Sequence, residues 1–159
     1  MSLKIKGILL AGAIWVAFLV LATSLSAGTG AGDNEIFRSF DVGYGGTLTV
    51  DTERGSIEVT TARAEKVEVE ITRKVLFGRG GDADEILEDF DIKFKHSGKD
   101  VSIYAESKHD WDWLWDNVRL RIHYAITVPE RYNLDLNTSG GSIEISDLEG
   151  EVECKTSGG

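Results

Sequence analysis

Residues 134–159, LDLNTSGGSIEISDLEGEVECKTSGG, decide the fold that this sequence predicts. The tetrapeptide TSGG occurs at 138–141 and returns eighteen residues later at 156–159. Between the two copies, apolar side chains are mostly separated by acidic residues, serine or glycine; they are Ile143, Ile145, Leu148, Val152 and Cys154. A short fixed period with glycine at the turns is typical of chains that stack strands into a solenoid.

The same unit occurs a second time, near the start of the domain. Residues 48–59, LTVDTERGSIEV, align with residues 134–145, LDLNTSGGSIEI. The alignment gives the pairs Val50–Leu136, Asp51–Asn137 and Val59–Ile145. In both copies apolar and polar residues alternate, which indicates strands with one buried face. We therefore expect like strand–turn–strand units at both ends of the domain, with the intervening residues inserted between them.

The inserted residues predict further strands and one helix. Alternating patterns indicate strands at 67–72, 90–95, 101–106 and 117–129. Ile86, Leu87 and Phe90 are spaced for one helical face, and Asp82 is suited to cap that helix. The predicted fold class is all-β, a β-solenoid or stacked β-strand roll with one short helix at about 82–90. The expected β domain covers residues 37–159, and because a turn signal stands at its end, we expect it to continue further.

The amino terminus has the pattern of an export signal. A short basic region precedes the apolar run 7–22, and small residues follow at 23–28. We expect residues 1–27 to be a signal peptide cut before Ala27, or an uncleaved signal anchor that contacts the membrane through 7–27. The glycine-rich stretch beginning at residue 28 predicts a flexible spacer over 28–36. The expected location is the periplasm, the cell surface or the extracellular medium.

Charge and cysteine content restrict the partners. The formal net charge is −10, and it becomes −12 if residues 1–27 are removed, because Lys4 and Lys6 are lost with them. A surface this acidic repels phosphate backbones, so nucleic acid is excluded as an expected partner. Cys154 is the single cysteine, so no intramolecular disulfide can form. Its place in an alternating strand predicts a small buried side chain.

Residues 108–116, KHDWDWLWD, have a composition that indicates a binding role in addition to a role in folding. In an extended conformation Trp111, Trp113 and Trp115 share one face. Such a face offers an aromatic platform for a sugar ring or a protein partner. The competing interpretation is that the three indoles cover one end of a small core.

No catalytic or cofactor site is predicted. The aspartates near His109 fit neither an EF-hand loop nor a zinc pattern, so no metal ligand and no cofactor are assigned. We expect His96 to be solvated, and we expect His123 and its neighbours Arg119 and Arg121 to pair with acids on adjacent strands. The expectation is a protein that is not an enzyme.

These motifs together resemble a known family. GTLTV and GSIEV early in the domain, YAITVP and YNLDL later, and the TSGGSIEISDLEGEV segment resemble the bacterial "putative adhesin" domain family of the cell envelope. The resemblance covers about residues 37–159 and implies a β-solenoid of unknown function without known catalysis. The function expected is adhesion, binding or assembly at the envelope, with an unknown protein or glycan as partner. The alternative is a carbohydrate-binding module that uses the tryptophans of 108–116.

Overall fold

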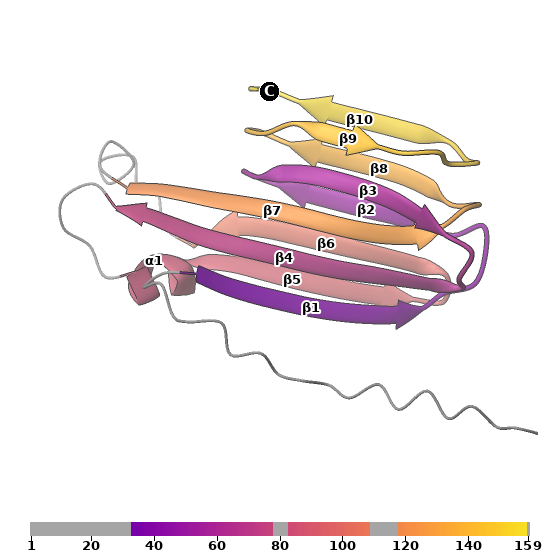
Figure 1. The fold of residues 1–159 in the computed structure, drawn as a ribbon, viewed down its shortest axis with the longest axis horizontal. Helices are drawn as coiled ribbons and strands as arrows, with labels where there is room; N and C mark the ends of the chain where they lie inside the picture. The colour runs from indigo at the N-terminus through magenta and orange to yellow at the C-terminus, as the bar shows by residue number, and fades with distance from the viewer. Residues whose placement is uncertain (1–32, 78–82, 109–117, 159) are drawn as a thin grey trace, which may run out of the picture.

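The computed structural model describes residues 33–77, 83–108 and 118–158, which form ten strands and one helix (Figure 1). The elements are β1 (Asp33–Asp41), β2 (Thr47–Thr52), β3 (Ser56–Ala62), β4 (Lys66–Phe77), α1 (Ala83–Asp89), β5 (Phe90–Ser97), β6 (Asp100–Ser107), β7 (Val118–Pro129), β8 (Asn133–Thr138), β9 (Ile143–Ile145) and β10 (Val152–Thr156). The mostly-β fold with one short helix is confirmed.

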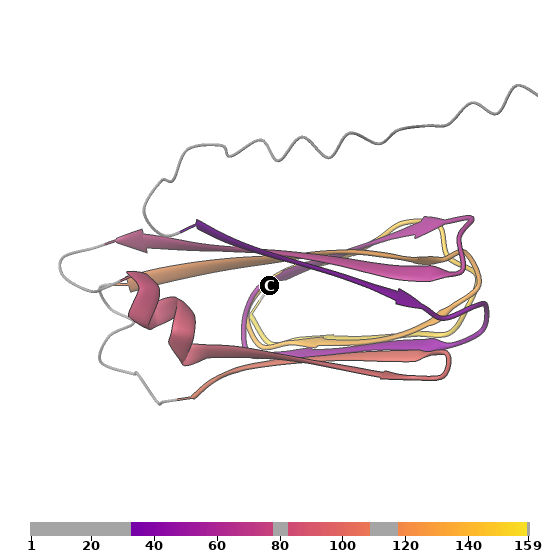
Figure 2. The same cartoon turned by 90° about the horizontal axis from the view of Figure 1, so that it is seen from below.

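The strands form two five-stranded sheets that lie face to face with the core between them (Figure 2). Sheet A has the order β1-β4-β7-β3-β9, and sheet B has the order β10-β8-β2-β6-β5. Both sheets are mixed, and neither closes on itself. Parallel pairing joins β7, β3 and β9 in sheet A, and β6, β2, β8 and β10 in sheet B. Antiparallel pairing joins β1, β4 and β7 in sheet A, and β5 and β6 in sheet B.

This arrangement corrects the expectation of a solenoid throughout residues 37–159. The repeated sequence unit is limited to β2–β3, to β8–β9 and to strand β10, but parallel pairing also joins β2 to β6 and β3 to β7. Beyond β6 and β7 the pairing is antiparallel, β5 with β6 and β4 with β7. For β5 and β6 the physical reason is that strands joined by a tight hairpin pair antiparallel, whereas parallel stacking needs a return crossing between the sheets.

Residues that align between the two sequence units are also paired with each other in the sheets. Leu48 pairs with Leu134 and Val50 with Leu136 in sheet B, and Val59 pairs with Ile145 in sheet A. The eighteen-residue step also holds, because Leu134 pairs with Val152 and Leu136 with Cys154. Inward residues of equivalent strands therefore stack in straight rows through the core. The alternation that predicted the strands also determines which side chains are buried.

Threonine hydroxyls connect successive turns at one end of these rows. Thr138 donates from Oγ1 to the carbonyl of Gly55 at 3.1 Å, and Thr156 donates to the carbonyl of Gly141 at 2.9 Å. Thr52 occupies the equivalent position in the first unit, where no glycine carbonyl of an earlier unit is present to accept its hydroxyl. The Thr52 hydroxyl instead forms a hydrogen bond of 2.9 Å with the phenol of Tyr124. The inserted strand β7 thus supplies the partner that an earlier unit would otherwise provide.

Two local expectations change in the structure. Cys154 is exposed rather than buried, because β10 is the outer strand of sheet B and among the described residues no strand lies beyond it. Strand β1 begins at Asp33, so residues 33–36 of the expected spacer pair with β4. Helix α1 falls within the expected 82–90. The expected signal segment 1–27 lies outside the described residues.

Alkaline pH is expected to destabilise the fold through buried phenols. Burial raises the pKa of Tyr124 from 10.0 to about 12, and burial followed by the charge of Asp100 does the same for Tyr132. Since the folded pKa lies above the unfolded one, this contribution is complete below about pH 10 and is lost as pH rises towards about 12. For Tyr124 it corresponds to about 2 to 3 kcal/mol.

Urea unfolding between about pH 9 and pH 12 measures this loss. Tyr124→Phe is expected to be less stable near neutral pH, because Thr52 loses its buried partner, and to show a shallower alkaline decline than the wild type. Equal declines in the two proteins would show that the Tyr124 phenol ionises as freely in the folded chain as in the unfolded one.

Candidate functional site

The three predicted binding tryptophans, Trp111, Trp113 and Trp115, lie outside the described residues. Their flanks are described: β6 ends at Ser107 in sheet B, and β7 begins at Val118 in sheet A. The described ends on either side of the segment therefore belong to different sheets, and both lie at the end of the molecule where α1 lies (Figure 1). The binding role of the tryptophans stays a prediction.

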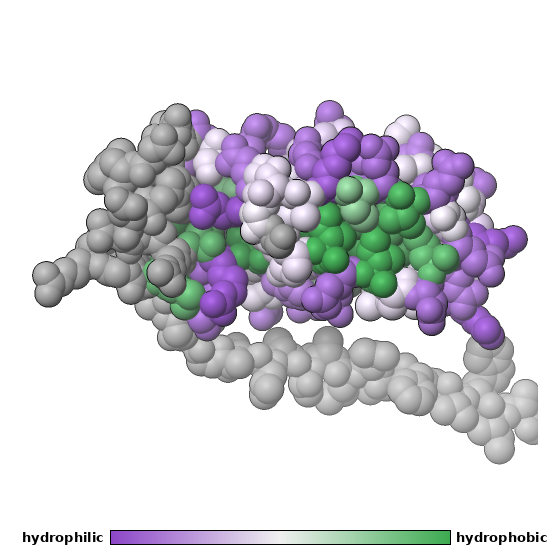
Figure 3. Space-filling view, turned by 90° about the horizontal axis from the view of Figure 1, so that it is seen from above, coloured by the Kyte–Doolittle hydropathy of each residue, from purple (hydrophilic) through white to green (hydrophobic). Residues whose placement is uncertain are grey.

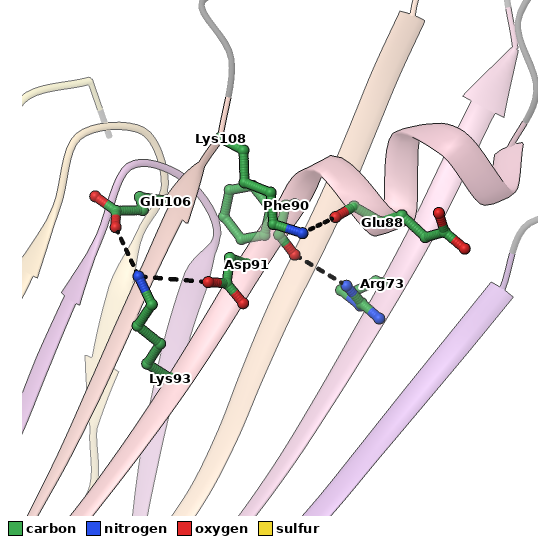
Figure 4. Close-up of polar contacts among 7 residues, drawn as sticks. All are labelled: Arg73, Glu88, Phe90, Asp91, Lys93, Glu106 and Lys108. Carbon is green, nitrogen blue, oxygen red and sulfur yellow. Dashed lines mark hydrogen bonds and ion pairs between the residues drawn. The ribbon is translucent and has the colours of Figure 1, made fainter.

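The start of that segment is fixed to the end of α1 (Figure 4). The backbone N–H of Lys108 donates to the carbonyl of Asp89 at 2.9 Å, and its ammonium donates to the carbonyl of Glu88 at 2.7 Å. A cation at the carboxyl end of a helix also interacts favourably with the helix dipole. Lys108 thus holds the beginning of the connection against the only helix among the described elements.

Arg73 fixes the other side of α1. Its guanidinium donates to the carbonyls of Leu87 at 2.9 Å and Phe90 at 3.3 Å, and to the Asn34 side chain at 2.7 Å. Burial lowers the pKa of Arg73, with an opposing effect from Tyr124. The role of Arg73 is structural, because its guanidinium joins β4 to β1 and to the end of α1. Figure 4 shows its hydrogen bond to the carbonyl of Phe90.

Beside α1, on the exposed side of sheet B, Lys93 lies between two carboxylates. Its ammonium is 3.1 Å from Glu106 and 3.4 Å from Asp91, and the hydrogen bonds to Glu106 and Asp91 raise the pKa of Lys93 (Figure 4). All three side chains are partly or largely exposed. The cluster is a solvated ion-pair network whose effect on stability is small.

The outer face of sheet A carries an acidic row beside an exposed aromatic ring. The register places five residues side by side across the sheet: Phe37, Glu70, Ala125, Glu58 and Glu144. Phe37 is 60% exposed. The small side chain of Ala125 leaves a shallow hollow of about 240 Å³ that Phe37, Glu58, Glu68 and Glu70 help to line. Among the described residues, no cation pairs with Glu68 or Glu70.

Next to this row the structure brings together three groups that sequence reasoning did not connect. Ser56 Oγ lies 3.0 Å from Nδ1 of His123, and Nε2 of His123 lies 3.4 Å from the carboxylate of Glu58. The pairing of His123 with an acid on a neighbouring strand is as predicted. Its contact with Ser56 follows from the β3–β7 register, in which these two residues are directly opposite.

The arrangement resembles a nucleophile with a base and an acid, but its position argues against catalysis. All three side chains point outward from paired strands, and both His123 and Glu58 are nearly half exposed. Acyl transfer needs preorganised N–H donors aimed at a developing oxyanion, whereas strand N–H groups are engaged in the ladder. The cluster is best described as a cross-strand hydrogen-bond network.

An apolar surface lies at the opposite end of the strand stack from β1 and β5. Here β9 is the edge strand of sheet A and β10 is the edge strand of sheet B, so the rows of core residues end at solvent. Val152 is 48% exposed, whereas its row partners Leu134 and Leu48 are 2% and 0% exposed. Figure 3 shows this end as a hydrophobic area with hydrophilic rims. We call it the β9–β10 end face, and it comprises Ile143, Ile145, Leu148, Val152 and Cys154.

The described ranges contain neither a candidate metal cluster nor a candidate membrane-spanning helix. In residues 33–77, 83–108 and 118–158, no three histidine, cysteine or acidic side chains are grouped to hold a metal ion. In the same residues, no helix has the length and hydrophobicity needed to cross a membrane.

No family model matches this sequence, and no curated protein matches it. Among solved structures, a "putative cell adhesion protein" from Clostridium sporogenes is similar, with 12% identity and a TM-score of 0.49 over 78% of this chain. A "putative adhesin" from Bacteroides fragilis has 13% identity and a TM-score of 0.35 over 79%. A "putative lipid binding protein" from Parabacteroides distasonis has 9% identity and a TM-score of 0.33 over 77%. The matches cover 58%, 59% and 63% of those chains, so this chain spans less than two thirds of each.

Proposed function

We propose that this chain is an exported, non-enzymatic binding protein of the cell envelope with an adhesin-like role. In this proposal residues 1–27 direct export, and the stacked units β2–β3 and β8–β9, with β10, form the solenoid-like part of the scaffold. The outer face of sheet A is the surface that engages a partner. A rigid sheet suits this role because its side chains are held at fixed spacing without an ordering cost on binding.

The observation that carries the proposal is the hollow beside Phe37. Phe37, which is 60% exposed, stands next to Glu68 and Glu70, which form no ion pair among the described residues, whereas the third carboxylate of the hollow, Glu58, lies 3.4 Å from His123. Carboxylates attract cationic groups, and the face of a phenylalanine ring adds a cation–π contact. The partner that fits this chemistry is a basic protein segment with lysine or arginine side chains, and the acidic net charge would speed its approach.

Binding of a short oligolysine peptide to the folded chain tests this proposal. Glu68→Gln together with Glu70→Gln is expected to weaken binding by about tenfold, and Phe37→Ala by several-fold, with the wild-type affinity falling as salt rises. The matched control is Asp135→Asn with Glu151→Gln, which removes the same charge from exposed positions at sheet B. Equal weakening by both double variants would show attraction by net charge alone and would contradict a site on sheet A.

A second candidate function is carbohydrate binding through Trp111, Trp113 and Trp115. It is favoured by the attachment of their segment at Lys108, which fixes its beginning against α1. Glycan retention by the wild type and by the triple alanine variant would distinguish the candidates. Loss of retention with an unchanged melting temperature supports glycan binding, and loss of folding supports a role of the indoles in packing.

A further inference from the structure

The outer face of sheet A carries opposite charges at two levels along its strands. Lys74 in β4 and Arg121 in β7 are exposed and directly opposite each other, and we call this pair the basic level. Four residues along the same strands, Glu70 and Ala125 are paired, with Glu58 of β3 on the other side of Ala125. These three residues line the acidic hollow, and we call them the acidic level. At about 3.4 Å per residue, the two levels are about 14 Å apart.

Arg121 has no charged partner among the described residues. Its strand neighbours Leu120 and Ile122 are 7% and 2% exposed, so the Arg121 side chain points away from the core. Within residues 33–77, 83–108 and 118–158, no ion pair or side-chain hydrogen bond involves its guanidinium. Lys74 lies opposite and repels it, because like charges face each other across the two strands. This guanidinium therefore favours contact with an acidic surface outside its own fold.

The two levels lie equally far from one cross-strand pair, Thr72 with His123. The basic level is two residues from this pair in one direction along the strands, and the acidic level is two residues from it in the other. A two-fold axis that runs across the strands at Thr72, between two copies, brings the basic level of each copy over the acidic level of the other. Because the axis runs across the strands, β4 then faces β4 and β7 faces β7.

In this arrangement Arg121 of one copy enters the hollow of the other. It faces Ala125, whose small side chain leaves the hollow of about 240 Å³, with Glu70 and Glu58 on either side. Sheets that pack face to face lie about 10 Å apart, a gap that one arginine side chain crosses. A guanidinium suits two flanking carboxylates because its N–H donors point in several directions in one plane.

We propose that this chain self-associates through the outer face of sheet A, as a two-fold dimer in which Arg121 of each copy occupies the acidic hollow of the other. The inference rests on the function proposed above, because it takes the hollow as the binding surface and identifies the basic partner as a second copy. The same patch serves both copies, so the assembly closes at two.

Two features oppose the dimer and make it weak. The net charge of −10 repels two copies, and the exposed Glu35, which pairs with Thr72, faces its own counterpart beside the axis. Exposed ion pairs also contribute little each. Association is therefore expected at about 100 µM protein, and not at about 1 µM.

Charge reversal tests the dimer, by sedimentation velocity of the full chain at about 100 µM. Arg121→Glu and Glu70→Arg are each expected to weaken association at least about tenfold, because each places like charges together at both ends of the interface. An equimolar mixture of the two variants is expected to form the dimer again, since the acid introduced at 121 then faces the arginine introduced at 70. Lys155→Glu is the matched control, because it makes the same change of charge at an exposed position of sheet B.

Three results would overturn the proposal: a wild-type chain that stays monomeric at about 100 µM, equal association of Arg121→Glu and Lys155→Glu, or a mixture that does not regain the dimer. Oligolysine binding at about 1 µM protein separates this failure from failure of the proposed function. If Glu68→Gln with Glu70→Gln weakens that binding while no dimer forms, the second copy alone is wrong as the partner. If oligolysine binding does not respond to the two substitutions, the function proposed for the hollow fails as well.

Discussion

Replacing Gly141 with alanine is expected to lower the free energy of unfolding by about 3 kcal/mol. Gly141 has φ of +151°, and a Cβ there would lie 2.3 Å from the carbonyl oxygen of Gly55 in the neighbouring turn. That oxygen cannot move away easily, because Gly55 N donates to Gly140 O at 2.8 Å and Thr138 donates to the same Gly55 carbonyl. The alanine side chain therefore has to push two stacked turns apart.

Gly140→Ala is the matched control, because it adds the same methyl group in the same turn. A Cβ at Gly140 meets nothing within 4 Å, so a cost of less than about 1 kcal/mol is expected. Urea unfolding followed by circular dichroism measures both variants. Equal losses of stability would contradict the close approach of the two turns.

Leu136→Ala is expected to destabilise the fold by about 3 kcal/mol, whereas Cys154→Ala should cost less than about 1 kcal/mol. The two residues occupy equivalent positions in neighbouring strands and pair directly with each other. Leu136 is fully buried between Val50 and Cys154, while Cys154 is exposed at the β9–β10 end face. Truncation inside the stack leaves a cavity, and truncation at the end face leaves space that solvent fills.

Thermal and urea unfolding of these two variants also report on the end face in solution. If Cys154→Ala proves as costly as Leu136→Ala, Cys154 is covered by something in the folded protein under the conditions of measurement. Stability that depends on protein concentration would identify the cover as another copy of the chain.

The sequence predicted the register of the repeated units because the physical cause is local. An alternating strand, a glycine turn and a second alternating strand have the same length in both copies, so aligned residues are also paired residues, as Val50 and Leu136 show. Helix α1 and the end of β7 at Pro129 were predictable for the same reason, since caps, periodicity and proline act within a few residues.

Other features depend on neighbours that periodicity does not specify. Alternation gives the face on which Cys154 lies, but burial also needs a strand beyond β10. The contact of Ser56 with His123 requires the knowledge that β3 and β7 are adjacent, although 67 residues separate the two side chains in sequence. The acidic hollow arises in the same way, because Phe37, Glu70 and Glu58 come from three different strands. Charge and exposure in the sequence indicated an acidic surface but gave no location for it.

The central claim is that β2 and β8 stack in register, since the core rows, the threonine bonds and the end face all follow from it. Disulfide trapping in a Cys154→Ser background tests this directly. Thr49 and Asp135 are paired neighbours on the outer side of sheet B, whereas Thr49 and Asn137 differ by two residues along the strand. Neighbouring strands are about 4.8 Å apart, within the range that a disulfide spans, and the offset pair lies beyond about 7 Å. In a redox buffer, Thr49→Cys with Asp135→Cys should form the disulfide readily and Thr49→Cys with Asn137→Cys should not. Preferential oxidation of the offset pair would contradict the register.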